Sequence, residues 1–219
     1  GYLRETYLQR ILQARVYEVA KETPLDHAPV LSGKLGSDVC LKREDMQPVF
    51  SFKIRGAHNK IASLSEEQKA HGVVASSAGN HAQGVAMSAS FLGVDAKIVM
   101  PVGTPKIKVD KVRALGGTVV LHGDSFDDAN EEATRLAEEE HREIVHPFDD
   151  PMVIAGQGTI GMEILKQMTG KPLDAIFVCC GGGGMLAGES FLLSLSLSLS
   201  LSLSLSLSLS VCVCVFVCV

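Results

Sequence analysis

The sequence lacks the features that mark several large classes of protein. Its 20 Lys and Arg against 25 Asp and Glu give a formal net charge of -5, and the basic residues form no stripe, which argues against a nucleic-acid partner. Cys179 and Cys180 are adjacent, so in a strand their side chains would point to opposite faces without metal-ligand spacing. A nucleotide phosphate loop ending in Gly-Lys-Ser or Gly-Lys-Thr is also missing. We therefore expect no nucleic-acid partner and no metal site.

The cysteines and the start of the chain bear on its compartment. Cys40, Cys179 and Cys180 lie in apolar, strand-like runs, and the other three cysteines lie near the C-terminus. We expect the first three to be buried, reduced thiols in a reducing compartment. The chain begins at Gly1 without a signal-peptide pattern, so we expect the true N-terminus, with any targeting segment, to precede it.

Residues 191–219 form a low-complexity tail in which Leu-Ser alternation is followed by Val-Cys alternation. Serine at every second position from Ser194 to Ser210 interrupts the apolar stretch that a membrane helix needs, so we expect no membrane span. A CT repeat read in triplets encodes Leu-Ser, and a GT repeat encodes Val-Cys. The pattern also imitates an amphipathic, aggregation-prone strand. We interpret the tail as a translated dinucleotide repeat and expect it to carry no function.

The rest of the chain has a globular composition, with 46% hydrophobic and 21% charged residues overall. Helical patterns follow Ser65 and Ser125, each a favourable helix cap. Short apolar or β-branched runs predict strands at residues 39–42, 73–76, 97–100, 118–122 and 175–180. Alternation of strands and helices predicts an α/β fold with a mostly parallel sheet. Ligands of such sheets bind beyond the carboxyl ends of the strands, so the loops there are the first candidates.

The first candidate loop, residues 47–57, contains Lys53 between apolar side chains. Phe50, Phe52 and Ile54 would put its amine against apolar surface, where burial lowers the pKa of a lysine, as an imine-forming lysine requires. A lysine whose stem packs while its amine reaches solvent fits the same pattern. Both interpretations remain open on this loop alone.

The second and third candidates are turns that follow strands. Ser77, Ala78, Gly79, Asn80 and His81 are small or polar residues before a helix, where free backbone N–H groups favour an anion. A helix that is merely capped there is the alternative, and we assign His81 no proton transfer.

The third turn is a run of glycines, Gly181, Gly182, Gly183 and Gly184, followed by Met185. Glycines let backbone N–H groups wrap a phosphate, although a plain flexible turn would have the same composition. The match Gly182-x-Gly184-x-x-Ala187 to a dinucleotide-binding motif lacks the acidic residue expected about 20 positions later.

A desolvated lysine, a carboxylate-binding turn and a phosphate cradle, each after a strand of one parallel sheet, are what a pyridoxal-phosphate enzyme acting on an amino acid needs. Residues 42–45, 51–57, 77–81 and 181–185 resemble the signatures of the fold-type II, tryptophan-synthase-like enzymes. Residues 42–57 and 147–159 resemble the biosynthetic threonine dehydratases (threonine ammonia-lyases) in particular. The resemblance extends from Tyr2 to Gly188.

This resemblance implies roles for individual residues. Lys53 would hold pyridoxal 5'-phosphate as a Schiff base and then remove the Cα proton of threonine, whose β-hydroxyl leaves to give 2-oxobutanoate, for isoleucine biosynthesis, and ammonia. Asn80 would bind the phenolic oxygen of the cofactor, residues 77–81 the substrate carboxylate, and residues 181–185 the cofactor phosphate. Phe52 would lie near the cofactor ring without an assigned role.

The resemblance also implies an organisation for the whole protein. Residues 1–190 would form an incomplete catalytic region, with a small lobe at roughly 47–150 and a large lobe from 1–46 and 151–190. The full protein would be a homo-oligomer, in a plastid or mitochondrion if eukaryotic and otherwise in the cytoplasm. The serine that contacts the pyridine nitrogen, the remaining strands and the regulatory region would follow Gly188. We therefore expect the chain as written to fold poorly, bind cofactor weakly and have negligible activity.

Ala78 distinguishes among relatives, because serine racemases of this fold carry a serine at that position. We expect elimination to be favoured over racemisation. Serine dehydration or another β-elimination, a non-catalytic pseudogene product and a nucleotide-binding module remain as alternatives.

Overall fold

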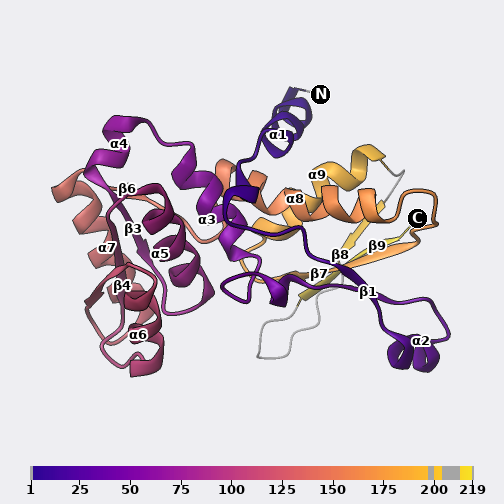
Figure 1. Ribbon diagram of the computed structural model, residues 1–219, viewed down its shortest axis with the longest axis horizontal. Coiled ribbons are helices and arrows are strands. Elements are labelled where there is room, and N and C mark those ends of the chain that lie inside the picture. Colours follow the sequence, from indigo (N-terminus) through magenta and orange to yellow (C-terminus); the bar gives the residue numbers. More distant parts are fainter. Residues whose placement is uncertain (1, 197–199, 204–212, 219) are drawn as a thin grey trace.

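The computed structural model describes residues 2–196, 200–203 and 213–218, with side chains for residues 7–190 (Figure 1). The N-terminal part contains α1 (Tyr2–Leu12), the 3-10 helix η1 (Val16–Glu18), β1 (Leu25–His27), α2 (Pro29–Leu35), β2 (Cys40–Lys42) and the 3-10 helix η2 (Glu44–Met46). The middle part contains α3 (Lys53–Ala62), α4 (Glu66–His71), β3 (Val73–Ser76), α5 (Asn80–Leu92), β4 (Ala96–Met100), α6 (Lys106–Ala114), β5 (Thr118–Leu121), α7 (Phe126–Glu140) and β6 (Glu143–Ile144). The last part contains α8 (Pro151–Gln167), β7 (Ala175–Cys180), α9 (Gly184–Ser196), β8 (Ser200–Leu203) and β9 (Val213–Cys218).

The middle part is built on a parallel four-stranded sheet in the order β5-β4-β3-β6. Side chains alternate across it as the period of a strand requires. Val73 and Ala75 of β3 pack with α3, α5 and α6, whereas Val74 packs with α7 on the opposite face. Both faces are therefore covered by helices, which explains why β3 is buried along its whole length.

Serine caps begin two of the helices, as the sequence predicts. Ser65 and Gln68 form a capping box at α4, and Ser125 and Asp128 form one at α7. On α7, Ala129, Ala133 and Leu136 are buried, whereas Phe126 in the first turn is 54% exposed.

Helix α3 lies between the four-stranded sheet and the last part of the chain (Figure 1). Glycines allow its close packing on two sides. A Cβ added to Gly84 of α5 would lie 3.2 Å from Ile54 Cα, and one added to Gly156 of α8 would lie 2.7 Å from Gly56 Cα. The position of the N-terminus of α3 is therefore set by backbone contacts with two other helices.

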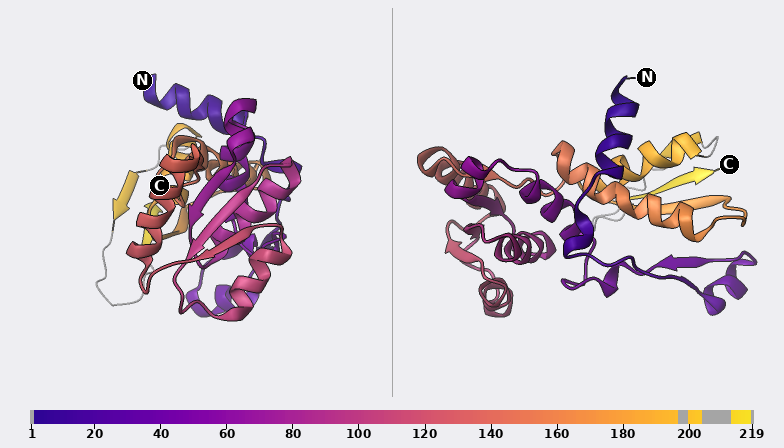
Figure 2. Two further views of the ribbon diagram at one scale, coloured as in Figure 1. Left: turned by 90° about the vertical axis from the view of Figure 1, so that its left-hand side faces the viewer. Right: turned by 45° about the horizontal axis from the view of Figure 1, so that its top comes forward.

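The other strands do not belong to the parallel sheet. β1 and β2 pair antiparallel, and β7 is the outer strand of an antiparallel sheet in the order β7-β9-β8. The β1–β2 ribbon and α2 lie at the opposite end of the molecule from the four-stranded sheet (Figures 1 and 2). The prediction that the three candidate loops follow strands of one parallel sheet is therefore wrong, because these strands belong to separate sheets.

The predicted strands are all present, with bounds that differ by one residue at most. Outside the tail, two strands were not predicted, β1 with three residues and β6 with two, because neither is long enough to show a periodic pattern. The tail contributes β8 and β9, and β9 pairs with β7 along its length. The expectation that the tail has no function falls partly on residues 197–199, 204–212 and 219, outside the described residues.

The prediction of three buried cysteines is wrong. Cys40 and Cys179 are exposed and Cys180 is half-buried, because β2 lies in a two-stranded ribbon and the alternate side chains of β7 face away from the core. Within the described residues, no helix is long and apolar enough to cross a membrane.

Candidate active site

Lys53 is the first residue of α3, so the segment predicted as a loop through residue 57 becomes helical at the lysine itself. Its Nζ donates a hydrogen bond to the carbonyl oxygen of Pro147 at 2.5 Å and lies 5.4 Å from the centre of the Phe52 ring. Burial lowers the pKa of the Lys53 amine. The positive end of the helix dipole also disfavours an ammonium group at this position.

The apolar surroundings of Lys53 are only partly those predicted. Ile54 is fully buried and Phe52 is half-buried beside the amine, but Phe50 is 69% exposed. Phe50 also has a positive φ of 56°, an unusual conformation for an aromatic residue. Desolvation of the amine therefore comes from the helix packing and Phe52 rather than from Phe50.

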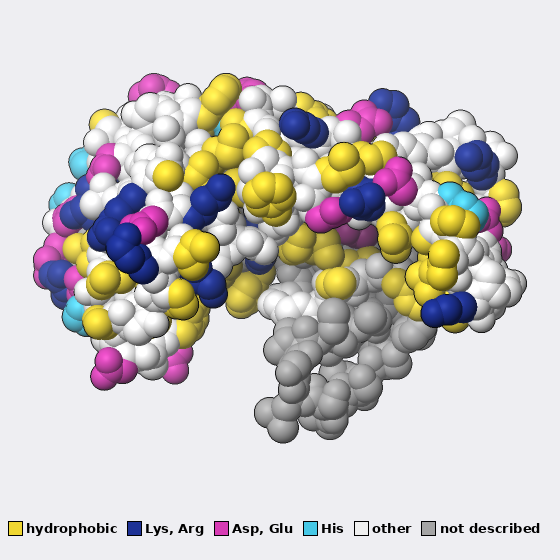
Figure 3. All heavy atoms as spheres, turned by 60° about the horizontal axis from the view of Figure 1, so that its bottom comes forward, with side chains coloured by type: hydrophobic (Ala, Val, Ile, Leu, Met, Phe, Trp, Pro, Cys, Tyr) yellow, Lys and Arg dark blue, Asp and Glu magenta, His cyan; other side chains and the backbone are white. Residues whose placement is uncertain are grey.

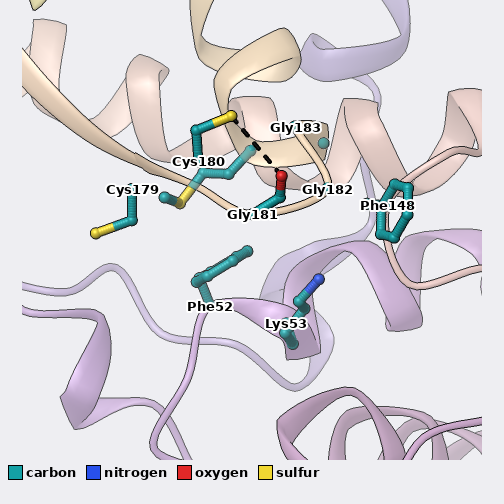
Figure 4. A pocket seen from close by; sticks show the side chains of 10 residues that line it. Phe52, Lys53, Phe148, Cys179, Cys180, Gly181, Gly182 and Gly183 are labelled. Carbon is teal, nitrogen blue, oxygen red and sulfur yellow. Dashed lines mark hydrogen bonds between the residues drawn. The ribbon is translucent and has the colours of Figure 1, made fainter. Parts of the chain in front are cut away.

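A cavity of about 190 Å³ opens between the N-terminus of α3 and the C-terminal end of β7 (Figure 4). Lys53 points into it from one side, and the glycine run lies on the other side. Its lining consists of Phe52, Lys53, Phe148, Cys179, Cys180, Gly181, Gly182, Gly183, Gly184 and Met185. Lys53 and the glycine run, two of the three predicted elements, thus share one cavity although they lie far apart in the sequence.

The glycine run joins β7 to α9, which begins at Gly184. Gly183 has a φ of 87°, a conformation that favours glycine, and a Cβ there would meet nothing within 4 Å. The run therefore lines the cavity at a helix N-terminus, a position at which backbone N–H groups can bind a phosphate. Together with a desolvated lysine amine, this donor set fits a phosphorylated aldehyde.

The second predicted turn, Ser77 to His81, lies at the N-terminus of α5 and does not line the cavity. The Gly79 N–H donates to Ser77 Oγ at 3.2 Å, Ala78 is half-buried, and Asn80, the first residue of α5, is exposed. The geometry of this turn fits an anion site and also fits a helix terminus without a ligand.

His81 at this turn is buried. Its Nε2 donates to the carbonyl oxygen of Val145 at 2.7 Å, and its Nδ1 has no hydrogen-bond partner. Burial lowers the pKa of His81 to about 4, so the ring is neutral at pH 7. The bond connects the N-terminus of α5 to the segment that follows β6.

Sequence reasoning missed the segment between β6 and α8 as part of the site, although residues 147–159 contributed to the resemblance. Pro147 accepts the Lys53 hydrogen bond and Phe148 lines the cavity. No motif indicates this role, because it depends on contacts with residues more than 30 positions away on either side.

A buried charged network supports α3 behind the lysine. The Arg55 guanidinium is fully buried and donates to Glu44, Glu163 and the Thr159 hydroxyl at 2.6–3.0 Å. Lys42 makes a second ion pair with Glu163, at 2.6 Å. Since these partners come from β2, η2 and α8, the network ties α3 to three other elements.

Comparison with known proteins identifies the class to which this fold and cavity belong. Residues 16–198 match the family model described as "Pyridoxal-phosphate dependent enzyme". The match includes most of the chain, and the chain belongs to this family. In structure it is similar to the processed form of threonine deaminase isoform 2 from Solanum lycopersicum, with a TM-score of 0.87 and 50% identity over 90% of this chain and 53% of that one.

Curated relatives define the resemblance more narrowly. The chain is 60% identical over 182 residues to the mitochondrial threonine dehydratase of Schizosaccharomyces pombe, which covers 83% of this chain and 30% of that protein. It is 54% identical over 187 residues to the L-threonine dehydratase biosynthetic IlvA of Escherichia coli, covering 85% of this chain and 36% of that protein. The chain thus spans about a third of the length of these relatives.

Proposed function

We propose that Lys53 attaches pyridoxal 5'-phosphate and that the protein to which this chain belongs deaminates L-threonine to 2-oxobutanoate and ammonia. The observation that carries the proposal is the shared cavity, in which a lysine amine with a lowered pKa faces a glycine run at a helix N-terminus. The identity to threonine dehydratases supports the choice of substrate. When bound, the cofactor supplies an electron sink for the carbanion formed at the substrate Cα.

The residues of the chain would supply the remaining requirements. Lys53 would offer a neutral amine for attachment and, once released, accept the Cα proton at Nζ. The N–H groups of residues 181–185 would bind the phosphate, and Phe52 would exclude water on one side of the amine. The turn at residues 77–81, at the N-terminus of α5, would orient the substrate carboxylate, with Asn80 reaching the phenolic oxygen of the cofactor.

The substrate is tested in the full gene product by measuring 2-oxobutanoate from threonine beside pyruvate from serine. We expect a higher kcat/KM for threonine. Lys53→Ala should abolish both activities, and its exposed counterpart Lys106→Ala, on α6, should retain both. A kcat/KM for serine tenfold above that for threonine would overturn the choice of substrate.

Serine is the second candidate substrate, because the structure is also similar to maize serine racemase, with a TM-score of 0.81 and 33% identity. Ala78 favours elimination over racemisation on that scaffold. The threonine and serine assays above separate the two candidates, and chiral analysis of recovered serine detects any racemisation.

We also infer the lobe assignment, with the small lobe at roughly 47–150 and the large lobe from 1–46 and 151–190, and a homo-oligomeric full protein. We infer a plastid or mitochondrial location if the source is eukaryotic and a cytoplasmic one otherwise, and the names of mitochondrial and chloroplastic relatives support the first. Size-exclusion chromatography with light scattering and cell fractionation test the last two proposals.

A further inference from the structure

The segment from Val145 to Phe148 contacts all three elements that the sequence predicts for the site, namely the turn at residues 77–81, Lys53 and the glycine run. The Val145 carbonyl accepts from His81, and the Pro147 carbonyl accepts from Lys53. Phe148 then reaches the glycine run. A single stretch of four residues therefore lies between the turn before α5, the lysine and the loop after β7.

The contact with the glycine run is unusually close. A Cβ added to Gly182 would overlap the Phe148 ring, and one added to Gly184 would lie 2.6 Å from the Phe148 carbonyl oxygen. Gly183, between them, faces open space. Gly182 and Gly184 are thus needed to leave room for Phe148. The interpretation of the run as a phosphate cradle therefore does not explain all four glycines.

The orientation of Phe148 is itself held by its neighbours. The His146 ring packs edge-on against the Phe148 ring with centroids 4.6 Å apart. His146 Nδ1 accepts hydrogen bonds from the backbone N–H groups of Phe148, at 3.3 Å, and Asp149, at 2.7 Å. Asp150 then caps α8 through the N–H groups of Met152 and Val153. The Phe148 ring is therefore part of an ordered turn rather than a free side chain.

We propose that Phe148 is a positioning residue, which holds the glycine run at the distance from Lys53 that a phosphorylated aldehyde must span. The inference rests on the proposed function. Phe148 reaches the run through its ring, while the preceding carbonyl, that of Pro147, bonds the lysine amine, so one short segment sets both ends of the cavity (Figure 4). Loss of the ring frees the run to move and weakens the grip on the phosphate group.

The test compares two probes, pyridoxal 5'-phosphate and pyridoxal, which differ only in the phosphate. Their Kd values are measured on the full gene product by fluorescence titration, for wild type, Phe148→Ala, Phe148→Tyr and the remote control Phe126→Ala. Phe148→Ala should raise the Kd of pyridoxal 5'-phosphate about 10-fold to 100-fold, the loss expected when one hydrogen bond to the charged phosphate is broken. Its Kd for pyridoxal should change less than about threefold, and the other two variants should resemble wild type.

A second comparison keeps the inference testable if Phe148→Ala unfolds. Gly182→Ala should weaken pyridoxal 5'-phosphate binding because its Cβ displaces the ring, and Phe148→Leu/Gly182→Ala should bind no more weakly than Gly182→Ala, since the two positions act through one contact. Equal weakening of both probes by Phe148→Ala, or additive effects in the double variant, would overturn the inference. A wild-type protein that binds neither probe at Lys53 would instead overturn the proposed function and the inference with it.

Discussion

At the scale of single residues, His81 gives the protein a defined pH dependence. Its pKa falls from 6.5 to about 4 on burial. Between pH 6.5 and about pH 4, His81 is therefore protonated in the unfolded state and neutral in the folded state. Stability from the neutral ring is complete at pH 7 and is lost as the pH falls through this window. We predict that wild type loses about 2.5 kcal/mol between pH 7 and 4.5 that His81→Gln retains.

Urea unfolding of both proteins at the two pH values measures this difference. Gln keeps an N–H donor for the Val145 carbonyl but does not titrate, so the comparison isolates the proton. Parallel pH profiles of the two proteins would contradict the assignment of a neutral, buried ring.

Arg55 lies at the centre of the buried ion-pair network behind Lys53, so its replacement should lower the free energy of unfolding. Arg55→Met would leave Glu44 and Glu163 without their shared partner, and breaking a buried ion pair costs about 3–5 kcal/mol. Arg135 on α7 is half-exposed and also bonds two glutamates, so Arg135→Met should cost less than about 1 kcal/mol. Similar unfolding free energies for the two variants would show that the Arg55 network contributes little.

At the scale of elements, the junction between the Phe148 segment and α8 depends on one cap. Asp150 accepts hydrogen bonds from the Met152 and Val153 N–H groups and pairs with Lys60 at 3.0 Å. We predict that Asp150→Ala lowers the unfolding free energy by about 1–2 kcal/mol, the usual value of a helix cap. Its exposed neighbour gives the control, since Asp149→Ala should stay within about 0.5 kcal/mol of wild type in the same urea titration.

Local sequence patterns predicted the start of some helices but not of others. The serines before α4 and α7 predicted helix starts because their side chains cap the backbone. The start of α3 has no capping box, since its N-cap residue Phe52 makes no side-chain cap bond and only Ser51 Oγ accepts from the Lys53 N–H, at 3.3 Å. The position of this helix start also depends on the close packing of α3 against α5 and α8. The lysine and the glycine run were predicted from their chemistry, whereas the intervening Phe148 segment was not, because its role exists only through tertiary contacts.

At the scale of the whole molecule, several large apolar side chains of the described residues are exposed. Val30 and Leu35 of α2 are 74% and 62% exposed, and Phe177 of β7 is 63% exposed. Figure 3 shows hydrophobic side chains on the face that it draws, including its right-hand end, where α2 lies. Surface of this kind marks an interaction site or an aggregation hazard.

We predict that the chain as written binds an apolar fluorescent dye and that replacing Val30, Leu31 and Leu35 by serine lowers this binding. The unfolding free energy should change by less than about 1 kcal/mol, because no residue of α2 is buried. The single exposed Ile107 of α6 serves as the control, and Ile107→Ser should leave dye binding near the wild-type level. Equal dye fluorescence in all three proteins would locate the exposed surface elsewhere.

The most direct test of the central claim, that Lys53 attaches the cofactor, is borohydride reduction followed by peptide mapping. The full gene product is incubated with pyridoxal 5'-phosphate, reduced, digested and analysed by mass spectrometry, beside Lys53→Ala and Lys106→Ala. We predict a single stable adduct on Lys53, absent in Lys53→Ala and unchanged in Lys106→Ala. An adduct on another lysine, or one that persists in Lys53→Ala, would contradict the account.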